Sequence, residues 1–130
     1  MNRHVDSSSN RMPPTKKATK YQTFREFWPF YLHEHSRKGT RALHLIGTAA
    51  ALACVVLAIA LRQPWFLLGG LVAGYAFAWV AHYFVEHNRP ATFTYPFKSF
   101  AADWVMFGAF LSGQLGNQLS KHGVRPKAKA

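Results

Sequence analysis

Residues 81–91, with the sequence AHYFVEHNRPA, place several metal-ligand types of side chain at the end of a long apolar segment. His82 and Glu86 are four residues apart and share one face of a helix that continues through this segment. Such groups are costly in lipid unless they are paired or bind a ligand. Imidazole and carboxylate suit iron, zinc, copper or nickel, whereas the lone cysteine, Cys54, lies in another apolar segment, where we expect only packing.

Two apolar segments on either side of a short link predict a pair of membrane-spanning helices. Residues 43–61 and 65–85 contain no Asp, Glu, Lys or Arg. At a rise of about 1.5 Å per residue, each can cross a hydrocarbon core roughly 30 Å thick. The link at residues 62–64 is too short for anything but an antiparallel hairpin. Gly70 and Gly74 form a small-xxx-small pair that permits close helix approach.

An antiparallel hairpin brings distant histidines to the same depth. His44 precedes the middle of the link by nineteen residues, and His82 follows it by nineteen. His35 lies nine residues before His44, across a polar turn that could fold it back over the helix ends. We therefore expect these three histidines and Glu86 to converge at one end of the bundle as a metal site.

A plainer interpretation exists for each of these residues taken singly. A histidine at a helix end is often an interfacial anchor or a capped polar residue, and Glu86 could simply pair with Arg89. His33 and His87 are nearby but off the inferred face, so they are reserve ligands or orienting groups.

Two further helical segments flank the hairpin. Residues 21–32 place aromatic side chains at helical spacing, which predicts an amphipathic helix, kinked or restarted at Pro29, in the membrane interface or docked on the bundle. Residues 99–119 have an unbroken apolar stretch only at 104–113, so this segment either crosses the membrane against the hairpin or lies partly in the interface.

The formal charge of +11 is concentrated in the ends of the chain. Basic flanks beside apolar segments are typical of cytoplasmic ends at an anionic membrane surface. Two spans plus an interfacial helix would put all basic regions on one side, which is the topology that we favour. If residues 99–119 form a third span, a fourth, short crossing by residues 21–34 would also satisfy the charges. The basic residues are neither spaced along a helix nor mixed with exposed aromatics, which argues against nucleic-acid binding.

The predicted fold is an all-α integral membrane bundle with a central antiparallel transmembrane hairpin, an N-terminal amphipathic helix and a C-terminal membrane or interfacial helix. Residues 1–20 form a disordered basic tail without a signal peptide, residues 21–119 the membrane-embedded domain, and residues 120–130 a second disordered basic tail.

Residues 30–48 and 81–107 together resemble the Mpo-like family of small membrane proteins, which includes a fungal Fe(II)-dependent 2-hydroxy fatty acid dioxygenase. The resemblance covers about residues 21–119. It depends on a Tyr-x-x-x-His pair, a nine-residue step to a second His followed by Gly, and a His-x-x-x-Glu pair near an Arg-Pro-Ala run, which here are Tyr31, His35, His44, Gly47, His82, Glu86, Arg89, Pro90 and Ala91.

The resemblance implies oxidative shortening of a 2-hydroxy fatty acid by one carbon with Fe(II) and O₂. It makes His35, His44 and His82 the iron ligands, with one or two ions open, and Glu86 a fourth ligand or an orienting group. Tyr31 and Asp103 also fall on family-like positions, and we include them with Glu86 as catalytic candidates.

Our first hypothesis is a membrane dioxygenase in a bacterial inner membrane, with cytoplasmic tails, acting as a monomer or as a homo-oligomer. The alkyl tail of the fatty-acid substrate lies among the apolar helices. Arg89 or Lys98 neutralises the substrate carboxylate, unless these two residues are only topology anchors. The alternatives are a metal-free helical membrane protein that assembles with a partner or binds lipid, and a zinc-dependent lipid hydrolase with the same ligands.

Overall fold

The computed structural model describes residues 21–125, and this part of the chain is entirely helical. The α-helices are α1 (Phe24–Glu34), α2 (Lys38–Ala60), α3 (Trp65–Val80), α4 (Pro96–Leu111) and α5 (Leu115–Lys121), with a π-helix η1 (Ala81–Glu86) and a 3₁₀ turn η2 (Ala91–Phe93) between α3 and α4. The predicted all-α class is confirmed for these residues. The predicted N-terminal tail and residues 126–130 of the C-terminal tail lie outside the described residues.

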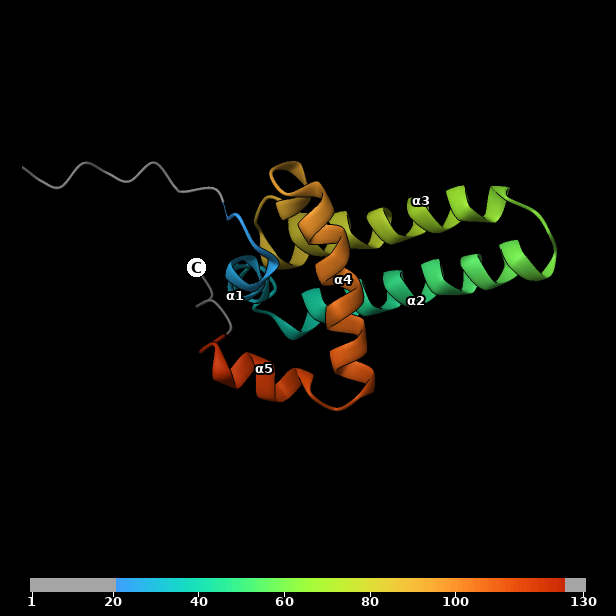
Figure 1. The fold of residues 1–130 in the computed structure, drawn as a ribbon. Coiled ribbons are helices and arrows are strands. Elements are labelled where there is room, and N and C mark those ends of the chain that lie inside the picture. The colour runs from blue at the N-terminus through green and yellow to red at the C-terminus, as the bar shows by residue number, and fades with distance from the viewer. Residues whose placement is uncertain (1–20, 126–130) are drawn as a thin grey trace, which may run out of the picture.

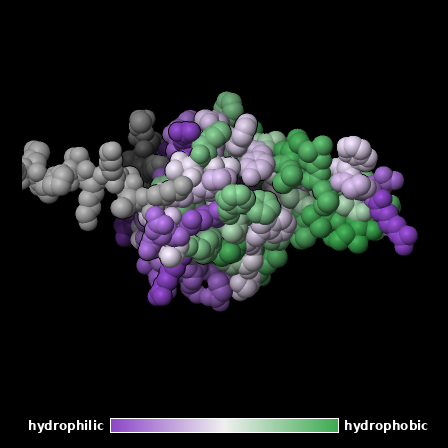
Figure 2. Space-filling model, turned by 45° about the horizontal axis from the view of Figure 1, so that its top comes forward, coloured by the Kyte–Doolittle hydropathy of each residue, from purple (hydrophilic) through white to green (hydrophobic). Residues whose placement is uncertain are grey.

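Helices α2 and α3 lie side by side and antiparallel, joined by the link at residues 61–64 (Figure 1). Among the described residues, α2 and the continuous helix Trp65–Glu86 are long and apolar enough to cross a membrane. Only 22% of each apolar window is buried, whereas the core helix of a soluble protein is mostly buried. Figure 2 shows hydrophobic side chains over this projecting pair, with hydrophilic ones at its tip and at the opposite end of the molecule. The apolar side chains of α2 and α3 therefore face outward, as in helices that contact lipid.

Glycines bring the backbones of α2 and α3 close together. A Cβ atom at Gly47 would lie 2.8 Å from the Cβ of Phe77 and 3.2 Å from the carbonyl oxygen of Gly74. A Cβ at Gly70 would lie 3.1 Å from the Cβ of Cys54. Since no real side chain tolerates the first of these distances, the contact requires glycine at position 47.

Helix α1 packs against α4 and forms the small core of the molecule. Thr23 caps its first turn by accepting a hydrogen bond from the backbone N–H of Glu26 at 3.2 Å, and the helix continues through Pro29 without a restart. Its residues Phe27 and Leu32 are fully buried, as is Met106 of α4. Hence α1 docks on the helical bundle, which is one of the two arrangements that its amphipathic pattern predicts.

The apolar segment at residues 99–119 is divided between two helices. The chain turns at Gly113, whose φ of +76° suits glycine, and α5 then runs in a different direction (Figure 1). Helix α4 contacts α2 and lies across it rather than along it (Figure 1). Consequently this segment is not one continuous rod parallel to the α2–α3 pair.

We predict that Gly47→Ala destabilises the folded protein, because the new methyl group would overlap Phe77 and the α3 backbone. The expected loss is about 1–3 kcal/mol, typical of overpacking, and is measured as a lower midpoint of thermal unfolding in mild detergent. Gly69→Ala is the matched control, since a Cβ there has nothing within 4 Å and alanine favours the helix. Equal melting of the two variants would contradict the close contact at Gly47.

Candidate metal centre

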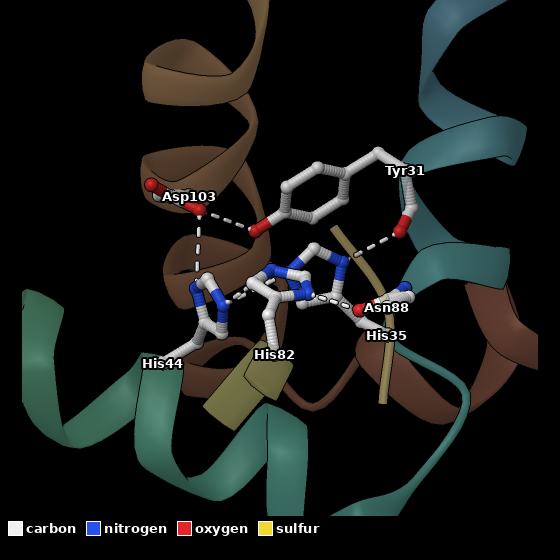
Figure 3. Close-up of polar contacts among 6 residues, drawn as sticks. All are labelled: Tyr31, His35, His44, His82, Asn88 and Asp103. Atoms are coloured by element: carbon white, nitrogen blue, oxygen red, sulfur yellow. Dashed lines mark hydrogen bonds and ion pairs between the residues drawn. The ribbon is translucent and has the colours of Figure 1, made fainter. Parts of the chain in front are cut away.

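Three imidazole rings converge where α1, α2 and η1 meet (Figure 3). His35, His44 and His82 are 1%, 5% and 2% exposed, and each offers a ring nitrogen within 4.8 Å of the others. We call these three residues the histidine cluster. The structure thus brings together the three histidines that the sequence predicts as neighbours, and this group can hold a metal ion.

The turn between α1 and α2 positions His35. His35 ends α1, and α2 begins three residues later at Lys38. The guanidinium of Arg41 donates to the carbonyl oxygens of His35 at 2.7 Å and of Ser36 at 2.9 Å. These bonds fix the turn that folds His35 back over the start of α2, so that its ring meets that of His44.

Helix η1 and the residue that ends it position His82. His87 adopts a left-handed conformation with a φ of 60°, which turns the chain so that the Asn88 backbone N–H donates to the carbonyl oxygen of His82 at 3.0 Å. The Asn88 side chain then reaches the same ring, with 2.7 Å between Asn88 Oδ1 and His82 Nδ1. Asn88 Nδ2 donates to Glu34 Oε2 at 2.6 Å, so Oδ1 is the end that accepts from His82.

The other two rings also use Nδ1 for an outward hydrogen bond. His35 Nδ1 lies 2.6 Å from the carbonyl oxygen of Tyr31, which can only accept. His44 Nδ1 lies 3.3 Å from the carboxylate oxygen Oδ1 of Asp103. These outer partners favour the tautomer that carries the proton on Nδ1 and directs an unprotonated Nε2 towards the centre, which is the one that metal-binding histidines adopt.

The Nε2 atoms are spaced as metal ligands would be. His44 Nε2 lies 3.1 Å from Nε2 of both His35 and His82. Metal–nitrogen bonds of about 2.0–2.1 Å separate neighbouring ligands by about 2.8–3.4 Å in octahedral or tetrahedral sites. Burial, then the neighbouring His44 and His82, hold the pKa of His35 well below its usual value. A proton therefore binds this ring poorly and competes little with a metal ion. The donor set fits a metal with open coordination positions.

Tyr31 and Asp103 support the cluster from the side of α4. Tyr31 donates its phenol proton to Asp103 Oδ1 at 2.5 Å, and its ring stacks on His35 with 4.1 Å between ring centroids. Burial, then the Asp103 carboxylate, raises the pKa of Tyr31 well above its usual value, so the phenol stays protonated. Burial also raises the pKa of Asp103, although the Tyr31 hydrogen bond opposes that shift. Tyr31 thus orients His35 directly and His44 through Asp103.

Glu86 binds the first turn of α2. Its Oε1 accepts from the Ser36 backbone N–H at 3.0 Å and from the Ser36 hydroxyl, and its Oε2 accepts from the Arg37 N–H at 3.1 Å and the Thr40 hydroxyl at 2.6 Å. A carboxylate at a helix N-terminus is favoured by the exposed N–H groups and by the helix dipole. Glu86 therefore ties the helix that carries His82 to the turn that follows His35.

The two candidate substrate-binding cations lie apart from the histidine cluster. The Arg89 guanidinium lies over the ring of Phe93, 5.0 Å from its centroid. Lys98 is in the first turn of α4 and is partly exposed. The structure places neither of them beside the cluster.

The two reserve histidines have other partners or positions. His33 Nε2 lies 2.9 Å from the carbonyl oxygen of His122, which joins α1 to the end of α5. His87 is exposed and acts through its backbone conformation, as described above.

Asn88, Ser36 and Thr40 are site residues that the sequence analysis missed. Asn88 stands two residues after Glu86, and an amide near a ligand-type histidine is a signal for an orienting partner. Ser36 and Thr40 flank the start of an apolar helix, where hydroxyl side chains commonly serve as caps. The capping signal does not indicate that Ser36 and Thr40 would bind the carboxylate of Glu86, which follows them by 50 and 46 residues.

We predict that His44→Ala removes metal from protein purified in mild detergent, because His44 Nε2 is adjacent to both other ring nitrogens. Metal per chain is measured by inductively coupled plasma mass spectrometry. His33→Ala is the matched control, as His33 lies outside the cluster and should leave the metal content unchanged. Retention of metal in His44→Ala would refute the centre.

A second prediction separates the roles open to Glu86. Glu86→Ala leaves four buried or half-buried donors without their acceptor, and we expect it to destabilise the fold by roughly 1–3 kcal/mol. Glu86→Gln keeps one oxygen acceptor and should retain most of the metal if Glu86 only anchors α2. Metal content of Glu86→Gln and thermal unfolding of both variants distinguish an anchoring role of Glu86 from a ligand role. Complete metal loss in a folded Glu86→Gln would show that Glu86 is a ligand.

Comparisons with known proteins bear on what such a centre does. No curated protein and no solved structure matches the chain. A family model described as 2-hydroxy-palmitic acid dioxygenase Mpo1-like matches residues 21–115, a range that contains the whole histidine cluster together with Tyr31, Glu86 and Asp103. The chain therefore belongs to the Mpo1-like family.

Proposed function

We propose that the protein is a membrane-bound non-haem iron dioxygenase that shortens 2-hydroxy fatty acids by one carbon. The observation that carries the proposal is the convergence of three unprotonated Nε2 atoms in a buried site. The family description, which names a 2-hydroxy-palmitic acid dioxygenase, supports the substrate class and the use of O₂.

The reaction balances without an external reductant. The bond between C1 and C2 of the 2-hydroxy acid breaks, C1 leaves as CO₂, and C2 becomes the carboxyl carbon of the shorter acid. The substrate gives up four electrons in this change, and one molecule of O₂ accepts them, with one of its oxygen atoms leaving in water. The 2-hydroxy acid thus supplies all the electrons that O₂ accepts and is itself the molecule that is cleaved. The site therefore needs only a metal, O₂ and the lipid substrate.

The residues divide the work between holding the metal and orienting its ligands. His35, His44 and His82 would hold iron, which supplies O₂ activation and a chelation site for the 2-hydroxyl and carboxylate. Asp103 and Asn88 accept the Nδ1 protons of His44 and His82 and so keep their ring planes fixed. Tyr31 positions His35 by stacking, and Glu86 holds the turn after His35 against η1.

We further propose that α2 and α3 span the membrane as a hairpin, with the histidine cluster near the cytoplasmic face of a bacterial inner membrane. The link between the helices carries a single cation, Arg62. The opposite end carries several cations, at the start of α2 and in the segment up to α4, namely Arg37, Lys38, Arg41, Arg89 and Lys98. This asymmetry favours cytoplasmic placement of the cluster end. Arg89 and Lys98 then serve as interfacial anchors and attract the anionic head of a fatty acid to the membrane surface.

We predict that iron-loaded protein in detergent consumes O₂ with 2-hydroxy-palmitic acid and releases CO₂ and pentadecanoic acid in equal amounts. An oxygen electrode and mass spectrometry measure the stoichiometry, and palmitic acid, which lacks the 2-hydroxyl, is the substrate control. Zinc-loaded protein should be inactive, and Tyr31→Phe, which keeps the stacked ring but loses the Asp103 hydrogen bond, should lose about tenfold in rate or metal affinity. Bound iron without O₂ uptake on any 2-hydroxy acid would refute the dioxygenase.

A further inference from the structure

A groove beside the histidine cluster runs along the α2–α3 pair beneath α4. The space between its walls, counted together with the part open to the surroundings, is about 410 Å³, of which about 40 Å³ is cavity proper, and His44 and Asp103 line one end of it. His44, Thr48 and Ala51, all lining residues, cover two turns of α2, which is about 10 Å of helix. We call this space the side groove.

The polarity of the side groove changes along its length. Thr48 of α2 and Tyr75 of α3 line it one turn from His44, and neither hydroxyl has a hydrogen-bond partner among residues 21–125. Farther from His44 the lining consists of small and apolar residues. Ala51 faces Gly70 there across the helix pair, and Leu71 follows Gly70. Polar groups near the cluster and apolar ones beyond match a molecule with one polar end.

The groove opens onto the apolar surface of the molecule. Leu71 and Phe100 line the groove and are nevertheless 47% and 46% exposed, so they form part of its rim. The surface around them is the outward-facing apolar side of α2 and α3. A ligand can therefore enter sideways from lipid without passing through water, with its polar end leading to His44.

We infer that the side groove binds the first half of the alkyl chain of a fatty acid, with the carboxyl end at the histidine cluster and the middle of a sixteen-carbon chain at Gly70 and Leu71. Small residues make room for the chain: a Cβ added at Gly74 would have no neighbour closer than 3.9 Å. Leu71 stands where the groove opens onto the apolar surface, so its side chain controls the exit through which the rest of a long chain leaves the groove. This inference deepens the proposed function, on which it depends for the identity of the polar head.

To test this inference, we replace Leu71, at the exposed rim farthest from His44, with the larger tryptophan, which narrows the groove there. Leu71→Trp should shift the ratio of kcat/KM for 2-hydroxy-palmitic over 2-hydroxy-decanoic acid towards the shorter acid by about tenfold, because tryptophan obstructs the exit that the longer chain needs, whereas the shorter chain extends little beyond the groove. Leu68→Trp is the matched control: Leu68 is on the same helix one turn away, is 57% exposed and does not line the groove. Both sites are exposed enough to accept tryptophan without repacking the core.

Photocrosslinking gives a readout that does not need catalysis. Palmitic acid with a diazirine near the middle of its chain should label peptides that contain Gly70–Tyr75 or Phe100–Trp104 in wild type and Leu68→Trp, with severalfold less label in Leu71→Trp. Labelling of this kind without O₂ uptake would support the groove and refute the dioxygenase. Dioxygenase activity with labels elsewhere, or with the same chain-length ratio in Leu71→Trp as in wild type, would overturn the groove.

Discussion

The structure depends on one electrostatic constraint: three imidazole lone pairs face one another in a buried site. Hydrogen-bond acceptors on the outer side of every ring favour the proton on Nδ1, and in that tautomer no Nε2 atom donates to its neighbour. At 3.1 Å such atoms repel unless a cation lies among them. Because burial disfavours a protonated ring, a metal ion relieves this repulsion better than a proton does. The arrangement is therefore costly alone and favourable when a cation is bound.

Much of the remaining polar structure keeps the three rings in place. They come from different helices, so small shifts between α1, α2 and η1 would separate them. Glu86 prevents one such shift by holding η1 against the start of α2, and Arg41 prevents another by closing the turn after His35. Asp103 connects the cluster to α4. A polar network of this kind is stable in an apolar setting only when its members are satisfied together, which explains why these residues occur at one end of the molecule.

The sequence predicts the elements and the meeting of the histidines better than it predicts their partners. Two uncharged segments and a three-residue link leave few ways to fold, and equal spacing from that link places His44 and His82 at one level. The π-helix, the left-handed His87 and the amide of Asn88 depend on local backbone geometry that periodicity does not encode. Glu86 follows His82 at a spacing that suits a shared ligand, yet it contacts Ser36 and Thr40, because the N-terminus of α2 offers it several donors.

In the enzyme that we propose, a metal centre next to a groove that opens sideways would let a poorly soluble substrate reach the metal without passing through water. A long-chain 2-hydroxy acid in a bilayer keeps its tail in the apolar layer and its head at the surface, which is the polarity that the side groove follows from Leu71 to His44. Its alkyl chain can thus move from lipid to protein with little change in hydration. Binding energy from that chain remains available to hold the head at the cluster. In the enzyme that we propose, the outward apolar faces of α2 and α3 would serve both as the membrane anchor and as the route by which the substrate arrives.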